Sequence, residues 1–299
     1  FERLATSSGP TGGEIRRPSD GKVPQSVVFI QCVGSRDEKK GVAYCSKVCC
    51  MYTAKHTMLY SHKVHGGKSY VFYMDIRSCG KRYEEFVRKA IEHDGAMYLR
   101  GRVSRVYERD GKVIVQGADT LLGSQVEIEA DMVVLATAIV SRTGADGLAQ
   151  KLGIGYDKYK FYNEYHPKLR PVETVTAGIF LAGTCMGPMD IPDAVAQGSA
   201  VGAKVLALFS ANEMTREPIT ALVNKAACNA CWDCLTACPY SAIERDAVKN
   251  RQGEITRRLA KVNEGVCQGC GVCVAACRSK SIDLRGYTDE QVYAALAAF

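Results

Sequence analysis

Short apolar runs alternate with amphipathic stretches over the first half of the chain. Ser26–Gln31, Ser69–Ile76 and Asp131–Thr137 are rich in aliphatic and aromatic residues, which predicts three buried strands. Tyr44–Tyr60 is predicted to be a helix between the first two strands, and Lys81–His93 a second helix before the third. This β-α-β-α-β order predicts an α/β fold, a small Rossmann-like domain with a parallel sheet.

The second predicted helix has its apolar residues three or four positions apart, so that they share one face. These residues are Tyr83, Phe86, Val87 and Ile91. Short alternating strands follow this helix, with a turn at Asp110–Gly111. They predict an antiparallel insertion into the Rossmann-like domain.

The pattern changes at both ends of this domain. The first 25 residues are rich in Gly, Pro and Ser and predict an extended segment with turns. Ala177–Ala182 is predicted to be a further strand, followed by a helix from about Asp190 to Leu208, and Glu213–Pro218 is the expected linker. The chain therefore divides into four predicted segments, 1–25, 26–140, 141–212 and 213–299.

Composition narrows the class of protein. A chain of 299 residues with 46% apolar residues suits about two globular domains, and no apolar stretch approaches the ~18 residues of a membrane span. The net charge is +7, but the basic residues are dispersed, which argues against nucleic-acid binding. Fourteen cysteines in so long a chain indicate a reducing compartment, hence the cytoplasm.

Eight of these cysteines form two runs with the spacing C-x₂-C-x₂-C-x₃-C, which is typical of bacterial ferredoxins with two cubane clusters. In that arrangement the fourth cysteine of each run ligates the other cluster. The first predicted ligand set is Cys228, Cys231, Cys234 and Cys277, and the second is Cys267, Cys270, Cys273 and Cys238. Zinc ribbons and disulfides are the alternatives, although zinc sites usually use two cysteine pairs.

A further cysteine set replaces the glycine-rich phosphate loop that normally follows the first strand of a Rossmann unit. It consists of Cys32, Cys45, Cys49 and Cys50. If the helix begins at Tyr44, Cys45 and Cys49 share one helical face, and the helix N-terminus would favour a negative cluster by roughly 0.3–1 kcal/mol. Three clusters, each carrying about −2, would compensate most of the positive charge. The alternative is that these cysteines are buried small hydrophobes.

Several stretches of the chain resemble the iron–sulfur flavoprotein component of heterodisulfide reductase, known as HdrA. They include GPTGGEIRRPSDG, FIQCVGSRD…AYCSKVCCMYTAK, GTCMGPMDIPDAVAQ and the ferredoxin tail. The resemblance covers essentially the whole chain and implies a thioredoxin-reductase-like FAD-binding fold followed by a two-cluster ferredoxin domain. It also implies a third [4Fe-4S] cluster on the C-x₁₂-C-x₃-C-C set, and it places Lys55 near the flavin N5. Segments 1–25 and 141–212 would then belong to the FAD domain.

The same resemblance implies a second set of flavin contacts. Gly183 and Thr184 would stand where related folds have Gly-Asp, with Thr184 in place of the carboxylate that binds the ribityl chain. The following helix start, which includes Asp190 among the predicted cofactor-binding residues, would add Ile191, Asp193 and Ala194 as donors. The alternative is an ordinary capped helix with Asp190 as its N-cap.

The chain also departs from the family pattern. It lacks a G-x-G-x-x-G motif for the FAD pyrophosphate and begins at Phe1, so it is expected to be the C-terminal half of such a protein. Either a separate chain supplies the N-terminal FAD-binding half, or the sequence is truncated. Cys79 and Cys185 have no assigned partner. Trp232, between two cluster ligands, is expected to shield a cluster from water.

The resulting prediction is a flavin and iron–sulfur electron-transfer subunit of a heterodisulfide-reductase-like complex. The resemblance implies flavin-based electron bifurcation, with other subunits, a hydrogenase or formate dehydrogenase module, and ferredoxin as partners. The rivals are an NAD(P)H-oxidising iron–sulfur flavoprotein and a flavin-free polyferredoxin relay. Within the family, a quinone-linked or an aromatic-ring-reducing complex could use a similar subunit.

Overall fold

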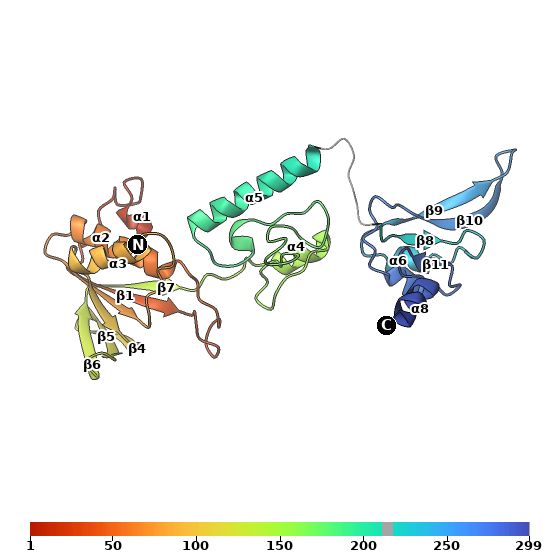
Figure 1. Ribbon diagram of the computed structural model, residues 1–299. Helices are drawn as coiled ribbons and strands as arrows, with labels where there is room; N and C mark the ends of the chain where they lie inside the picture. The colour runs from red at the N-terminus through yellow and green to blue at the C-terminus, as the bar shows by residue number, and fades with distance from the viewer. Residues whose placement is uncertain (211–217, 299) are drawn as a thin grey trace. The chain divides into compact units, whose positions relative to one another are not determined.

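The computed structural model describes residues 1–210 and 218–298 (Figure 1). Phe1–Arg142 and Ala182–Gly198 form one compact unit, and Thr143–Leu181 and Ser199–Phe299 form another. The linker predicted over Glu213–Pro218 falls, except for its last residue, outside the described residues. None of the described helices is long and apolar enough to cross a membrane.

The first unit is built on a four-stranded sheet in which every pair of neighbours is parallel, in the order β3-β2-β1-β7 (Figure 1). The strands are β1 Ser26–Val33, β2 Lys68–Tyr73, β3 Met97–Arg100 and β7 Met132–Thr137. Parallel pairing with helical crossovers confirms the predicted Rossmann-like sheet. The second strand ends three residues earlier than its apolar run predicted.

Two helices cross over between the strands, α2 over Cys49–Lys63 and α3 over Tyr83–Glu92, and a short helix α1 spans Glu2–Ala5. The prediction that the first crossover helix begins at Tyr44 is wrong. Lys47 has a left-handed backbone with φ 61°, which an α-helix does not admit. Cys45 therefore precedes the helix and does not share a helical face with Cys49.

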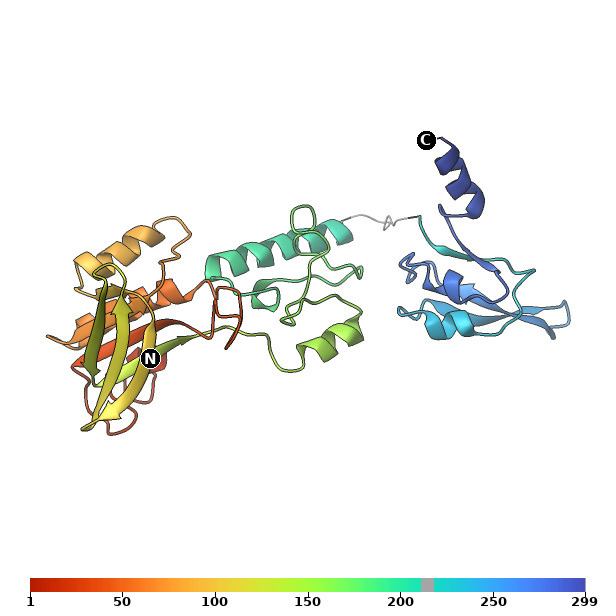
Figure 2. The same cartoon turned by 90° about the horizontal axis from the view of Figure 1, so that it is seen from below.

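Alternate residues of the central strand pack on opposite sides of the sheet, as the two-residue period of a strand requires. Val27 and Phe29 pack with Tyr60 of α2, whereas Val28 and Ile30 pack with residues of the small antiparallel sheet. That sheet is the predicted insertion, and Figure 2 shows it beside the parallel sheet. Its strands are β4 Val103–Arg109, β5 Lys112–Asp119 and β6 Ser124–Ala130.

The predicted hairpin turn is confirmed, whereas the predicted buried face of α3 is confirmed only in part. Asp110 and Gly111 both have positive φ, 53° and 74°, which is the geometry of a tight hairpin turn. In α3, Val87 is buried as expected, but Ile91 is 36% exposed and Ala90 takes the buried position instead. The apolar face of α3 is thus narrower than the sequence pattern suggested.

The predicted strand at Ala177–Ala182 is wrong. This segment forms only an isolated bridge between Glu173 and Phe180, because no described strand lies alongside to pair with it along its length. The predicted helix start near Asp190 is confirmed by α5, Ile191–Phe209, in which no residue is buried. The remaining elements here are α4 Ala145–Leu152 and the 3₁₀ turn η1 Gly183–Cys185.

The C-terminal part contains two antiparallel strand pairs, β8 with β11 and β9 with β10. The strands are β8 Ala221–Val223, β9 Ile243–Lys249, β10 Ile255–Val262 and β11 Ile282–Leu284; the helices are α6 Asp233–Ala237, α7 Val272–Ala276 and α8 Asp289–Ala297. Five of the eleven buried residues of its core are cysteines, packed with aliphatic residues such as Leu259 and Ile282. A core so rich in thiols leaves little hydrocarbon to stabilise the fold by itself.

A buried hydrogen bond in the first unit generates a stability prediction. Tyr60 is fully buried, and its hydroxyl donates to the Pro24 carbonyl at 2.9 Å. Tyr60→Phe should leave that carbonyl unpaired and lower the local free energy of unfolding by about 1–3 kcal/mol. Native-state amide exchange of β1 measures this, with the exposed Tyr293→Phe as the control. Equal protection of β1 in both variants would contradict the assignment.

Candidate functional site

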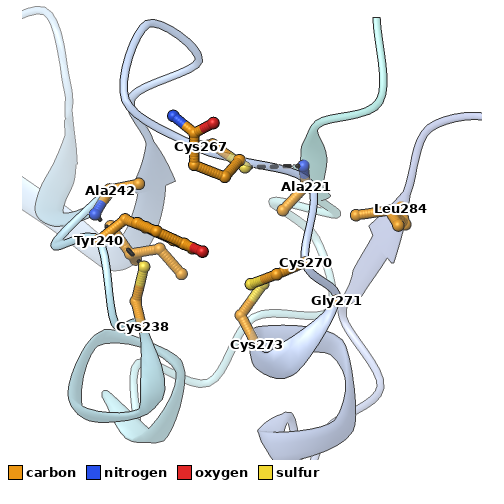
Figure 3. Close-up of a pocket in the computed structure, with 11 residues that line it drawn as sticks. Ala221, Cys238, Tyr240, Ala242, Cys267, Cys270, Gly271, Cys273 and Leu284 are labelled. Atoms are coloured by element: carbon orange, nitrogen blue, oxygen red, sulfur yellow. Dashed lines mark hydrogen bonds between the residues drawn. The ribbon is translucent and has the colours of Figure 1, made fainter. Parts of the chain in front are cut away.

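Figure 3 shows a cavity in the C-terminal part that four cysteines line from different parts of the chain. Three come from the second cysteine run and one from the first: Cys267, Cys270, Cys273 and Cys238. The rest of the wall is mostly apolar, with Ala221, Ile243 and Leu284 among its residues and the Tyr240 ring at one side. The structure thus brings together the cysteines that spacing assigned to the second cluster.

A matching cavity is lined by the other predicted set, Cys228, Cys231, Cys234 and Cys277. The local backbone explains the exchange of the fourth cysteine. Each run wraps through left-handed residues and enters a five-residue helix that carries the third cysteine. The helix ends at Ala237 or Ala276, and the next residue, Cys238 or Cys277, has an extended backbone (φ −74° and −78°) that turns the chain away. The last thiol of each run therefore faces the other cavity.

The four cysteines of each of these two sets surround a cavity and do not meet at a single point. Among the described residues, no three His, Cys, Asp or Glu side chains converge closely enough to hold a single metal ion. All fourteen cysteines lie in the described part of the chain and are free thiols. Four thiols around a small apolar space suit a multi-atom iron–sulfur cluster, which accepts one thiolate on each iron.

Hydrogen bonds to sulfur, which sequence inspection missed, surround these thiols. Backbone N–H groups donate from Ala221 to Cys267 at 3.5 Å, and from Ala242 to Cys238 at 3.3 Å. Ser281 approaches Cys277 twice, through its backbone N–H at 3.2 Å and its hydroxyl at 3.3 Å. Such donors stabilise negative charge on sulfur.

Burial and these hydrogen bonds pull the thiol pKa values in opposite directions. Burial, reinforced by the neighbouring cysteines, raises the pKa of Cys273 to about 11. Burial also acts on Cys277, yet the hydrogen bonds from Ser281 and Ser279 outweigh it and leave the pKa of Cys277 lowered. Without a cation, a thiol in the position of Cys273 would remain protonated at neutral pH.

The third cysteine set lies in the first unit, at the carboxyl end of β1 and the start of α2. Cys32 ends the regular part of β1 with φ 59°, Cys45 lies in the loop, and Cys49 and Cys50 are the first residues of α2. Burial, followed by the charges of Cys50, Cys32 and Cys45, raises the pKa of Cys49 to about 12. The four thiols are therefore close enough to repel one another when ionised.

Polar groups from two loops, one between β1 and α2 and one between β2 and α3, surround this set. Arg36 makes two hydrogen bonds to Asp75, at 2.6 and 2.9 Å, and these lower the pKa of Asp75. Backbone N–H groups of Arg77 and Lys47 donate to Cys50 and Cys45, at 3.4 and 3.3 Å. Arg36, Asp75 and Arg77 were not singled out from the sequence, because nothing in their spacing ties them to the cysteines.

The predicted flavin-contact residues gather at η1 and the start of α5. The Gly183 N–H donates to the Gln197 side chain at 2.7 Å, which holds the turn against the helix. The Asp193 N–H donates to the Asp190 carboxylate at 3.0 Å, as the capped-helix alternative expects, and the Ala194 N–H donates to the Asp190 carbonyl at 3.0 Å. Ile191 and Thr184 are both exposed. The flavin contacts stay a prediction.

Two lysines of the cysteine segment have different environments. Lys47 pairs with Asp190 at 3.8 Å and contacts Asp193, so it links the third cysteine set to the helix start. Lys55 instead pairs with Glu2 at 2.5 Å, with half of its side chain exposed. Its predicted role near a flavin stays a prediction.

The two remaining cysteines stand outside the three sets. Cys79 is exposed, and Cys185 is half-buried with its thiol donating to the Ala182 carbonyl at 3.3 Å. Neither lines either cavity of the C-terminal part.

Comparison with known proteins places these sites in context. Residues 227–282 match the family described as the 4Fe-4S dicluster domain. An iron-sulfur subunit of the CoB–CoM heterodisulfide reductase of Methanopyrus kandleri, designated A 2, is 46% identical over 246 residues, which is 82% of this chain and 38% of that protein. Its counterpart in Methanocaldococcus jannaschii, designated A, is 45% identical over 294 residues, 98% of this chain and 44% of that protein.

A third relative has a more specific name. It is the corresponding component of the H(2)/formate:CoB-CoM heterodisulfide,ferredoxin reductase of Methanococcus maripaludis, 44% identical over 97% of this chain and 44% of that protein. The chain therefore spans less than half the length of these curated relatives. Among solved structures, T. acidophilum thioredoxin reductase has a TM-score of 0.42 at 18% identity, over 61% of this chain and 52% of that chain.

The Ser281 hydroxyl generates a prediction about redox potential. Removing it in Ser281→Ala should keep the iron content but destabilise the more negative, reduced state of the cluster that Cys277 is predicted to ligate. A lost hydrogen bond of about 0.5–1.5 kcal/mol corresponds to a midpoint potential lower by about 20–60 mV. An EPR-monitored titration measures it, with Ser279→Ala (3.6 Å from Cys277) as the weaker control. An unchanged midpoint would mean that this hydroxyl does not act on the sulfur.

Proposed function

Because this chain is homologous to the C-terminal part of the heterodisulfide reductase iron–sulfur protein HdrA, we propose that it is an electron-transfer subunit of such a complex. The C-terminal 4Fe-4S dicluster domain is the part that relays electrons. The single observation that best supports this role is the pair of cavities, each lined by three cysteines of one run and one of the other. That arrangement would hold two one-electron centres next to each other in one small domain.

The proposed ligands are the three cysteine sets described above. Two sets serve the dicluster domain, and Cys32, Cys45, Cys49 and Cys50 would hold a third [4Fe-4S] cluster. Burial raises the pKa values of Cys32, Cys49 and Cys50, and other cysteines of the set raise them further, which supports the assignment because the four sulfur atoms then lie near one another, as the ligands of one cluster must. The helix N-terminus at Cys49 and Cys50 adds a favourable partial charge.

We also propose that the chain holds the flavin side of an FAD. When bound, a flavin accepts electrons in pairs and releases them singly. The turn at Gly183 and Thr184 and the start of α5 would contact it, and Lys47 connects that region to the third cysteine set. A separate chain or segment would supply the pyrophosphate-binding half, consistent with the greater length of the relatives.

In the full complex we propose flavin-based electron bifurcation in the cytoplasm. One electron would go toward ferredoxin and one toward a disulfide-reducing subunit, with a hydrogenase or formate dehydrogenase module as donor. The names of relatives, which include hydrogen, formate and ferredoxin, support these partners. This chain's own contribution would be to hold its clusters away from water and in electrical contact.

A flavin-free relay is the second candidate. It is favoured by the fact that the Asp193 and Ala194 amides already donate to Asp190. Flavin analysis of the protein purified with its partner chains separates the two candidates. One FAD per chain supports the flavoprotein, whereas full iron with no flavin supports the relay.

Iron content tests the three-cluster proposal. The anaerobically reconstituted protein should bind about twelve iron atoms, and Cys49→Ala should bind about eight. Cys79→Ala, at an exposed cysteine outside the sets, should still bind about twelve. A wild-type protein that saturates at eight would eliminate the third cluster.

Lys55 is tested through the flavin potentials of the full, FAD-loaded complex. Lys55→Ala should keep iron and FAD but change the gap between the two one-electron potentials, with about 59 mV for each tenfold change in equilibrium. Glu2→Gln, which removes the partner of Lys55 but not its charge, should change the gap much less. Identical, unchanged potentials in both variants would leave Lys55 a purely structural residue.

A further inference from the structure

An open hollow of about 360 Å³ lies beside the first cysteine cavity and has no role in the function proposed so far. The β9–β10 hairpin forms its walls, and the loop of the first cysteine run contributes an aromatic ring. Its lining residues are Trp232, Arg245, Asp246, Ala247, Lys249 and Arg258.

The hollow is positively charged. Arg245, Lys249 and Arg258 are exposed, and Asp246 is the one acidic residue among those that line it. Within residues 1–210 and 218–298, no ion pair involves any of the three basic side chains, although other surface cations of the chain are paired. Unpaired cations around a concave surface attract a negatively charged partner.

Trp232 connects this surface to the cysteine cavity. It lies between Cys231 and Cys234, lines the cysteine cavity as well as the hollow, and is half-buried. The Arg245 guanidinium lies 5.0 Å from the centre of the indole. One aromatic ring thus borders both the basic surface and the proposed cluster.

The backbone conformation of Trp232 is unusual for a bulky residue, as comparison of the two cysteine runs shows. Trp232 has φ 71°, a left-handed conformation that bulky side chains rarely adopt. The equivalent position of the second run is Gly271, with φ 76°, where such a conformation costs little. The chain therefore keeps a large aromatic residue where its own second copy has glycine. Strain of this kind tends to persist at functional sites.

We propose that this hollow docks an acidic protein that carries one-electron equivalents, and that electrons pass between that carrier and the first cluster beside Trp232. One electron moves between the two centres, so that one is oxidised as the other is reduced, with no bond or proton transferred. The inference rests on the proposed function, because it requires a cluster bound by Cys228, Cys231, Cys234 and Cys277. The basic residues of the hollow favour an acidic partner through complementary charge. The adjacent cysteine cavity would hold the cluster that exchanges electrons with this partner.

The test uses an acidic two-cluster bacterial ferredoxin, reduced with dithionite, as the probe. Lys249→Glu/Arg258→Glu should weaken its binding to the iron-loaded protein about tenfold or more at about 50 mM salt and flatten the salt dependence. The matched control is Arg251→Glu/Lys261→Glu, which changes the charge equally on the same hairpin but outside the hollow. Its affinity should change less than about threefold. Biolayer interferometry at several salt concentrations measures both.

Trp232→Gly separates docking from electron exchange. Glycine suits the left-handed backbone, so full iron content is expected, with affinity within about threefold of wild type. Stopped-flow electron transfer at saturating carrier should be slower by about tenfold or more, because contact at the ring is lost. Equal weakening by the two charge variants, or an unchanged rate in Trp232→Gly, would overturn the inference.

Two further outcomes distinguish its failure from that of the proposed function. Wild-type protein that binds the carrier, lacks iron at the first cysteine set and exchanges no electrons would contradict the proposed function. Iron-loaded protein that does not bind the carrier would contradict the docking surface. Tighter binding of a single-stranded oligonucleotide, lost in Lys249→Glu/Arg258→Glu, would make the hollow a nucleic-acid surface and overturn the inference.

Discussion

Cysteines gathered in partly buried groups of four would repel one another as thiolates, and the residues around them are arranged to compensate that charge. Burial raises the pKa of Cys49 to about 12 and of Cys273 to about 11, with neighbouring cysteines adding to the effect. We propose that the iron of the bound clusters compensates most of this negative charge. Backbone amides, the Ser281 hydroxyl and the N-terminus of α2 supply smaller contributions from the protein itself.

The same constraint explains two features that would otherwise weaken the fold. The C-terminal part has cysteines where a small domain normally has leucine or valine, so its core depends on what the thiols bind. Left-handed residues at Cys32, Ala230 and Trp232 bend the backbone around the sulfur atoms. In both units, short regular elements end where thiols must converge. The sheet and helices thus act mainly to position cysteines that lie far apart in the sequence.

Sequence inspection predicted those parts of the structure that depend on local pattern. The parallel strands, the hairpin turn at Asp110–Gly111 and the exchange of Cys238 and Cys277 between cavities all follow from periodicity or spacing. The predicted start of the first crossover helix was wrong because Lys47 has a left-handed backbone, which the type of residue alone does not indicate. The strand at Ala177–Ala182 was wrong because an apolar run becomes a strand only beside a partner strand.

Residues that support the sites from a distance were the hardest to foresee. Arg36 and Asp75 are 39 positions apart, and Ser281 reaches Cys277 only after the chain turns back from α7. The sequence predicted a role near the flavin for Lys55 and none for Lys47. In the structure Lys47 contacts the start of α5, whereas Lys55 pairs with Glu2. These contacts depend on tertiary structure, and a single sequence carries no signal for them.

The central claim is that the chain binds three clusters, two of them through cysteines exchanged between runs. Anomalous diffraction at the iron edge, from crystals of anaerobically prepared protein, tests it most directly. Three iron peaks are expected: one among Cys228, Cys231, Cys234 and Cys277, one among Cys238, Cys267, Cys270 and Cys273, and one among Cys32, Cys45, Cys49 and Cys50. Clusters bound by four cysteines of a single run, or no iron beside Cys49 in protein that retains iron elsewhere, would contradict it.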